Sequence, residues 1–149
     1  MAEVRDLYQE LIVEHSRKPR NCGKLEGADH TATGYNPLCG DKVTVYLTLD
    51  GDRVRDIRWE GSGCAISTAS ASLMTERSKS KPRAESDALF EIFHKLVTGG
   101  ALGEEEAAQL GKLAVFSGVK EFPVRVKCAT LAWHTLRAAL EGTHSVTTD

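Results

Sequence analysis

The chain has 149 residues, of which 41% are hydrophobic and 27% are charged, and its formal net charge at pH 7 is −2. This length suits one domain, residues 1–149, that can bury a hydrophobic core. The small net charge argues against nucleic-acid binding, and no apolar stretch approaches the roughly 20 residues that a transmembrane helix needs. The N-terminus has no basic-then-apolar signal pattern, so we expect a cytoplasmic protein whose cysteines stay reduced.

The N-terminal half predicts one helix followed by a small antiparallel sheet. The helix is expected from about Ala2 to His15, because apolar residues recur there at helical spacing. Apolar and polar residues alternate from Val43 to Leu49, and after the turn Asp50-Gly51-Asp52 the chain returns as a partner strand, Arg53 to Glu60. A third strand is expected near Thr31 to Asn36. The apolar positions of the helix are Val4, Leu7, Tyr8, Leu11 and Ile12.

The C-terminal half predicts helices. The segment after Cys64 is rich in small residues, which permit close packing, and Lys79 to Ser86 forms a polar break that contains Pro82. The tail from Thr143 to Asp149 is expected to fray. The remaining helices are expected at about Ala88–Val97, Glu104–Val115 and Pro123–Glu141. We therefore expect an α+β fold, with a three-stranded antiparallel sheet packed against about five helices.

Three cysteines and one aspartate form a candidate metal-binding set: Cys39, Asp41, Cys64 and Cys128. Three thiolates and one carboxylate can complete the tetrahedral coordination of zinc, or they can bind an iron–sulfur cluster. The carboxylate oxygen is a hard donor among soft sulfur donors and is the ligand expected to leave most readily. This composition favours a site that exchanges what it holds.

The sequence around each cysteine suits a thiolate. Cys39 lies in a tight loop between Pro37 and Gly40. Cys64 is expected to open a helix, where unpaired N–H groups and the positive end of the helix dipole stabilise negative charge. Cys128 lies in the early turns of the last helix and gains part of this effect, and Arg125, one turn earlier, adds a positive charge on the same face.

Other chemistries fit these residues less well. The chain has no Cys-x-x-Cys pair of the kind that structural zinc fingers use, and no local signature of a cysteine hydrolase. The segment Gly61–Ile66 lacks the third glycine of a dinucleotide-binding loop. Cys22 is interpreted as a bystander surface thiol. The scattered histidines are expected to have surface or packing roles, and they are His15, His30, His94, His134 and His144.

Three motifs resemble those of the U-type iron–sulfur assembly proteins. They are Asn36–Asp41, Gly61–Thr75 and Phe122–Trp133, and the segment from Leu7 to Asn21 extends the similarity toward the N-terminus. The resemblance covers nearly the whole chain to about Leu140. It implies an α+β fold of the SufE/IscU type.

Two features are similar to the SUF-system branch of this family, the SufU-type proteins. Lys127, which with Arg125 is a predicted neighbour of the metal ligands, stands where the scaffolds of the ISC system carry a histidine. The segment from about Ser78 to Gly103 is also longer than theirs. The resemblance then implies a zinc site, a SufS-type cysteine desulfurase as partner, a SufBCD-type scaffold downstream, and a monomer or weak homodimer. The implied zinc ligands are Cys39, Asp41, Cys64 and Cys128.

The resemblance further implies a zinc-dependent sulfurtransferase that accepts persulfide sulfur from the desulfurase. We expect Cys39 to be the nucleophile, because it lies in an open loop beside Gly40 and not on a packed helix. A histidine of the desulfurase would replace Cys39 on zinc and free it to attack. Arg125 is expected to pair with Asp41 or with the departing thiolate.

Two alternatives remain at this stage. The same four groups could carry a transient [2Fe–2S] cluster on a scaffold, although Lys127 in place of the histidine weighs against this. The zinc site could instead be purely structural.

Two basic segments, Arg17–Lys24 and Arg77–Arg83, are either solvated surface or docking elements for an acidic face of the desulfurase. Aromatic residues do not interleave with these charges, which again argues against nucleic-acid binding.

Overall fold

The structure is a computed structural model that describes the backbone of residues 2–147 and the side chains of residues 9–147. Helix α1 spans Ala2–Arg17, two residues longer than expected. Its expected apolar positions Val4, Leu7 and Tyr8 lie outside the described side chains, whereas Leu11 and Ile12 pack against the core. The end of the helix is anchored by His15, which is buried and whose Nδ1 lies 2.7 Å from Ser72 Oγ.

The three expected strands form and pair in sequence order. Strands β1 (His30–Asn36), β2 (Asp41–Asp50) and β3 (Arg53–Ser62) are antiparallel neighbours. Alternate residues of β2 are buried, as the sequence pattern predicts. Gly51 adopts a φ of 60° in the β2–β3 turn, a conformation that glycine takes without steric cost.

A fourth strand, β4 (Ser145–Thr147), pairs in parallel with β1 and completes the order β3-β2-β1-β4. The prediction that the tail frays is therefore wrong for these residues. The Thr33 N–H donates to the His144 carbonyl at 2.9 Å, so β4 satisfies backbone groups at the edge of β1. So short a strand has no periodic pattern of its own; it forms because the preceding helix returns the chain to that edge.

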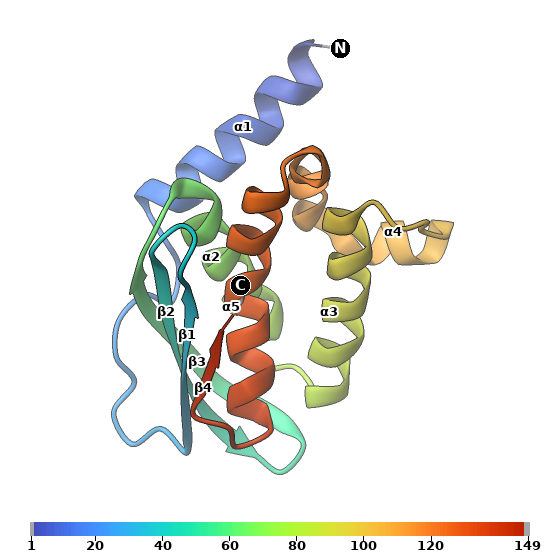
Figure 1. The fold of residues 1–149 in the computed structure, drawn as a ribbon. Coiled ribbons are helices and arrows are strands. Elements are labelled where there is room, and N and C mark those ends of the chain that lie inside the picture. Colours follow the sequence, from blue (N-terminus) through green and yellow to red (C-terminus); the bar gives the residue numbers. More distant parts are fainter. Residues whose placement is uncertain (1, 148–149) are drawn as a thin grey trace.

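Two helices cover one face of the sheet (Figure 1). Helix α5 (Pro123–Leu140) lies along β1 and β2, and α2 (Ala65–Ser78) packs against α5 and α1. The small residues of α2 allow this close contact, and a Cβ on Gly34 of β1 would lie only 1.9 Å from Thr135 Oγ1 of α5. Inside the contact, Ser70 donates a hydrogen bond to the Ala129 carbonyl and accepts one from the indole N–H of Trp133.

The region between α2 and α5 differs from the sequence prediction. Helix α3 (Arg83–Thr98) begins directly after Pro82, so the expected polar break is shorter than Lys79–Ser86. Pro82 has no backbone N–H group, so it leaves no unpaired donor directly before the helix, and α3 can begin at Arg83. Helix α4 (Glu104–Leu110) ends before Val115, because Gly111 takes a φ of 53° and a 3₁₀ helix, η1 (Gly111–Glu121), follows.

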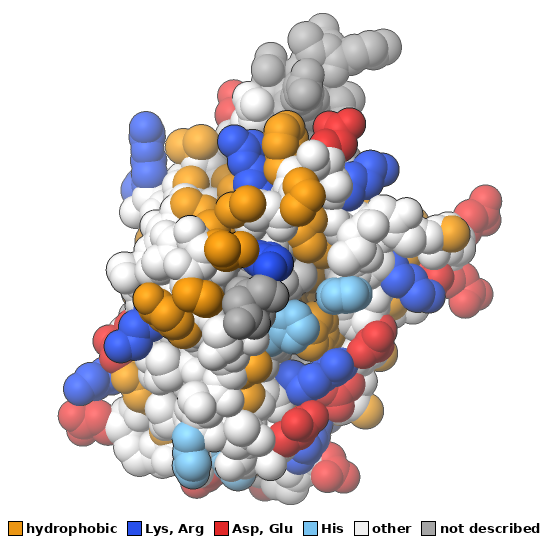
Figure 2. Space-filling model, viewed as in Figure 1, with side chains coloured by type: hydrophobic (Ala, Val, Ile, Leu, Met, Phe, Trp, Pro, Cys, Tyr) orange, Lys and Arg blue, Asp and Glu red, His pale blue; other side chains and the backbone are white. Residues whose placement is uncertain are grey.

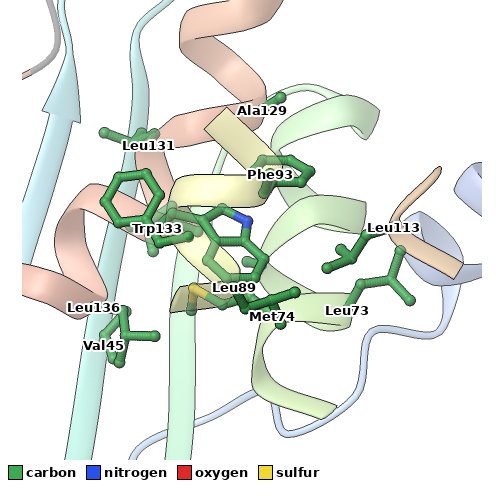
Figure 3. Close-up of a cluster of buried hydrophobic side chains, with 14 of the residues drawn as sticks. Val45, Leu73, Met74, Leu89, Phe93, Leu113, Ala129, Leu131, Trp133 and Leu136 are labelled. Carbon is green, nitrogen blue, oxygen red and sulfur yellow. The ribbon is translucent and has the colours of Figure 1, made fainter. Parts of the chain in front are cut away.

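The core lies between the sheet and the helices (Figure 3). Trp133 of α5 stacks on Phe93 of α3, with ring centroids 4.9 Å apart and an interplanar angle of 22°. Phe116 of η1 meets Phe93 edge-on, at 5.6 Å between centroids. These rings join α3, η1 and α5 in one hydrophobic core. Over the described residues, no helix is both long enough and apolar enough to cross a membrane.

Candidate metal centre

Three segments that are distant in the sequence meet at one end of the sheet, the upper end in Figure 1. Cys39 lies in the β1–β2 turn, Asp41 begins β2, Cys64 directly precedes α2, and Cys128 lies in the second turn of α5. The sulfur atoms of Cys39 and Cys128 are 3.3 Å apart. One ligand atom from each of Cys39, Asp41 and Cys128 lies within 4.8 Å of the others. The fourth predicted ligand, Cys64, lies outside this three-residue group, with its Sγ 4.0 Å from Asp41 Oδ2.

The β1–β2 turn is shaped by Asn36 and Gly40. The Asn36 side-chain oxygen accepts the Leu38 N–H at 3.1 Å, and the Asn36 carbonyl accepts the Gly40 N–H at 2.8 Å. Gly40 has a φ of 74°, in the left-handed region that favours glycine. The turn leaves Cys39 exposed at its tip and directs Asp41 inward, where it is 1% exposed.

The glycines before Cys64 make room for the start of β2. A Cβ on Gly63 would lie 2.6 Å from Asp41 Oδ1, and one on Gly61 would lie 2.1 Å from the Lys42 carbonyl oxygen. The Cys64 N–H then donates to Asp41 Oδ1 at 3.1 Å. The sequence does not reveal this role of the glycines, because a glycine beside a helix start is equally typical of a turn.

Cys64 caps α2 as its position predicts. Its sulfur accepts the Ser67 N–H at 3.5 Å, which satisfies one of the free donors at the start of the helix. The side chain nevertheless remains exposed. Cys64 is thus a sulfur donor fixed on a rigid helix terminus.

Cys128 differs from the other two cysteines because it is buried. Burial raises the pKa of its thiol, and hydrogen bonding to Asp41 and Cys39 raises it further. Without a bound cation, burial therefore outweighs the stabilisation of a Cys128 thiolate expected from the start of α5. A cation bound beside this sulfur would reverse the effect.

The buried carboxylate of Asp41, like the buried thiol of Cys128, would be stabilised by a bound cation. No lysine, arginine or histidine among the described residues forms an ion pair with this carboxylate. A buried carboxylate without a cationic partner is costly. The donor set of thiolates and carboxylate suits zinc, which would supply that partner.

The two other predicted site residues lie beside Cys128 without contacting Asp41 in an ion pair. The Arg125 guanidinium stacks over the Phe122 ring, 4.7 Å from its centroid. Lys127 is partly exposed. The pairing of Arg125 with Asp41 or with a thiolate stays a prediction for a loaded site.

Residues outside the predicted set lie away from the centre or are engaged elsewhere. Cys22 is exposed and forms a backbone bridge with Trp59 in β3. His15 packs between α1 and α2, and His94 and His134 lie around the Phe90 ring. No histidine belongs to the metal-ligand cluster found among the described side chains.

The family model described as "NifU-like N terminal domain" matches residues 7–129. The chain belongs to this family. This confirms the resemblance to U-type iron–sulfur assembly proteins.

Two curated relatives of the family cover most of both chains. An iron–sulfur cluster assembly scaffold protein IscU from Streptococcus pyogenes is 38% identical over 143 residues, which are 95% of this chain and 87% of that protein. A zinc-dependent sulfurtransferase SufU from Bacillus subtilis is also 38% identical, over 91% of this chain and 90% of that protein. The relative named as a scaffold and the relative named as a sulfurtransferase thus have the same sequence identity to this chain.

Solved structures confirm the fold. A SufU from Fervidobacterium islandicum, described as a putative scaffold protein for the SUF system, superposes with a TM-score of 0.82 at 38% identity and covers 88% of this chain and 94% of its own. An N-terminal NifU-like protein from Brucella abortus superposes with a TM-score of 0.81 at 25% identity, over 93% of this chain and 95% of its own. The α+β fold class is therefore established, with one strand more than the sequence predicts.

Proposed function

We propose that this chain acts as a single U-type domain and is a zinc-dependent sulfurtransferase in iron–sulfur cluster assembly. In this proposal Cys39 accepts sulfur from the persulfide of a SufS-type cysteine desulfurase. The observation that carries the proposal is the contrast between Cys39 and Cys128. Their sulfurs are 3.3 Å apart, yet Cys39 is exposed on a turn and Cys128 is buried in a helix. Only one of the paired thiols is thus open to a large sulfur donor.

Zinc fits the donor set. Cys39, Asp41, Cys64 and Cys128 would hold the ion, and the buried carboxylate of Asp41 lacks any other cationic partner among the described residues. When bound, zinc supplies the positive charge that keeps the ligating thiols deprotonated. Asp41 lies beside both Cys64 and Cys128 and is the hardest, most exchangeable of the four donors.

The transfer itself needs no external oxidant or reductant. The Cys39 thiolate attacks the outer sulfur of the donor persulfide, and a new S–S bond forms at Cys39 Sγ. The S–S bond of the donor breaks at the same time, and the donor cysteine leaves as a thiolate that takes up a proton. Cys39 is then the persulfide, and the oxidation level of the transferred sulfur is unchanged.

An apolar rim beside Cys39 supports docking of the desulfurase at this end of the molecule. Leu38 is 63% exposed next to Cys39, and Phe122 and Val124 are 47% and 51% exposed at the start of α5. Figure 2 shows hydrophobic side chains gathered over this end of the sheet. Exposed apolar residues in one patch mark interaction surfaces more often than isolated ones do.

The basic segments contribute less to docking than their charge suggests. Arg20 pairs with Glu14, and Lys79 pairs with Asp56. The Arg77 guanidinium donates to the carbonyl oxygens of Gln109 and Leu110 and so closes the end of α4. These charges are used within the fold, and we propose the apolar rim as the main contact.

The cluster scaffold remains the second candidate function. The Streptococcus pyogenes relative carries that name at 38% identity, and the same four side chains could bind a [2Fe–2S] cluster as cargo. Asp41 would then favour release of the cluster to an acceptor.

Metal analysis and sulfur transfer together separate the two candidates. Protein purified without oxygen is analysed for zinc, iron and sulfide, and then mixed with a SufS-type desulfurase and ³⁵S-labelled cysteine. The sulfurtransferase predicts about one zinc per chain, no sulfide, and label on the wild type and on Cys22→Ala but not on Cys39→Ala. Iron and sulfide in equal amounts, with no label on Cys39, would instead establish the scaffold.

A further inference from the structure

The side chain of Asn36 has a buried donor that the site described above does not use. Asn36 is fully buried at the end of β1, and its Nδ2 has no hydrogen-bond partner among the described residues. A buried amide donor without a partner is costly, and native proteins leave few of them. A hydrogen-bond acceptor near Nδ2 would remove this cost.

The orientation of the amide follows from its other end. The Asn36 Oδ1 accepts the Leu38 N–H at 3.1 Å within the β1–β2 turn. An amide nitrogen in that place would face another donor, so the hydrogen bond fixes oxygen toward the turn and Nδ2 away from it.

The register of β1 along α5 places Asn36 beside the metal centre. The start of β1 lies near the end of α5, because a Cβ on Gly142 would lie 4.0 Å from His30 Cε1. Farther along β1, a Cβ on Gly34 would meet Thr135 Oγ1 and Leu131 Cδ1, so β1 and α5 run in opposite directions. Asn36 is two residues beyond Gly34 and therefore on the same, buried face of the strand.

The next turn of α5 beyond Leu131, toward its start, contains Cys128. Across the sheet, the direct partner of Asn36 in the β1–β2 register is Asp41. Side chains at such opposed positions are close neighbours. By this register Asn36 lies between Asp41 and Cys128, two residues of the proposed zinc site, although its Nδ2 forms a hydrogen bond with neither of them in the structure.

We propose that Asn36 is a positioning residue that donates a hydrogen bond from Nδ2 to the metal-bound sulfur of Cys128. The inference rests on the proposed function, because it requires a metal ion on this sulfur. The other two sulfurs have donors already: Cys39 is exposed to water, and Cys64 Sγ accepts the Ser67 N–H. Cys128 is 3% exposed and receives no N–H group among the described residues.

Such a hydrogen bond would distinguish the two neighbouring thiolates chemically. An N–H donor stabilises a thiolate against protonation and fixes its orientation, which favours its retention in the site. It also withdraws electron density from the sulfur, which reduces its nucleophilicity. Cys128 would remain a fixed ligand, and Cys39, without a buried donor, would be the sulfur that reacts. Asn36 would in this way determine which of two thiolates 3.3 Å apart accepts the cargo.

The variant Asn36→Thr tests the inference. Threonine is close to asparagine in volume, and its hydroxyl can accept the Leu38 N–H as a short side chain does in a turn. It puts a methyl group in place of the amide nitrogen. The matched control is Thr33→Val on the opposite face of β1, which removes the Thr33–Thr44 side-chain hydrogen bond of 3.1 Å at constant shape.

Two measurements read the hydrogen bond without any turnover. The Kd for zinc is determined by competition with a chromophoric chelator, and the sulfur-to-metal charge-transfer band is recorded after replacing zinc with Co²⁺. Asn36→Thr is expected to bind zinc about 10-fold more weakly. Its charge-transfer band should move to lower energy, because an unbonded thiolate gives up electron density more easily. Thr33→Val should match the wild type in both.

The outcomes separate this inference from the proposed function. A wild type that binds neither zinc nor Co²⁺ overturns both. A wild type that binds both ions, with an unshifted band and an unchanged Kd in Asn36→Thr, overturns the inference alone. If Asn36→Thr does not fold, Asn36→Ser, which keeps a hydroxyl acceptor for the turn but cannot reach α5, is judged by the same two results.

Discussion

The carboxylate of Asp41 lies directly against the backbone of Gly63, so close that a Cβ on residue 63 would be 2.6 Å from Asp41 Oδ1. The next residue, Cys64, donates its N–H to the same oxygen at 3.1 Å. One short turn between β3 and α2 therefore both accommodates the carboxylate and orients it. The other oxygen, Oδ2, is left on the side of the Cys64 sulfur, at 4.0 Å.

This contact predicts that Gly63→Ala displaces Asp41 and weakens metal binding. We expect a zinc Kd about 10-fold higher, typical of a disturbed ligand support, with the fold retained. Gly118→Ala is the control, because a Cβ there meets no atom within 4 Å. Chelator competition measures both variants. Equal zinc affinity in Gly63→Ala and wild type would show that Asp41 needs no such support.

Two buried serines of α2 are expected to respond oppositely to removal of the hydroxyl group. Ser70→Ala leaves the Trp133 indole N–H without a buried partner and removes the additional hydrogen bond to the Ala129 carbonyl, so it should lower the free energy of unfolding by about 1–3 kcal/mol. Ser78 is equally buried, but its Oγ has no partner among the described residues. Ser78→Ala should be neutral or stabilising. Urea denaturation of the two variants decides, and equal losses would contradict the hydrogen bonds assigned to Ser70.

The close approach of β1 and α5 predicts a compensating pair. Gly34→Ala should destabilise the chain by about 1–3 kcal/mol, because the new methyl group would overlap Thr135 Oγ1. Adding Thr135→Ala removes the hydroxyl oxygen that the new methyl group would overlap, so the double variant should be more stable than Gly34→Ala alone. A double-mutant cycle in urea measures the coupling. Strictly additive losses would mean that the helix shifts away instead.

Stability is expected to fall on acidification through His15. Burial first, and then the positive charge of Arg20, lower the pKa of His15 from 6.5. The folded chain therefore binds fewer protons than the unfolded chain, and the contribution of His15 is fully present above pH 6.5 and is lost as the pH falls through the lowered pKa. The structure agrees, because Ser72 Oγ accepts the Arg20 N–H at 2.8 Å and can donate its own proton to an unprotonated His15 Nδ1.

Thermal unfolding at pH 7.5 and pH 5.5 tests this expectation. His15→Gln removes the titrating group and should flatten the decrease of Tm with acidification, although its Tm at pH 7.5 will be lower. His144→Gln, which changes an exposed histidine in the tail, is the control and should keep the decrease of the wild type. His134, whose pKa burial also lowers, contributes in the same direction, so part of the decrease should persist in His15→Gln.

Much of the architecture could be predicted from local patterns. Alternation in β2, the turn at Gly51, and proline at the first residue of α5 each have a local physical cause, and each element formed where expected. Predictions failed where the cause is not local. The end of α4 depends on the φ of Gly111 and on the Arg77 guanidinium that closes it, and β4 depends on the edge of β1.

The sequence by itself determined the chemical types of the candidate ligands, the elements that carry them and the family. These follow from residue identity and short-range periodicity, which a single chain displays directly. Only the tertiary structure decided that Cys128 is buried while Cys39 is exposed, that Gly63 makes room for Asp41, and that Arg125 stacks on Phe122. It also decided that the side-chain amide of Asn36 is buried without a hydrogen-bond partner among the described residues. Burial and hydrogen bonding depend on which segments meet across the fold, and those contacts join residues that are far apart in the chain.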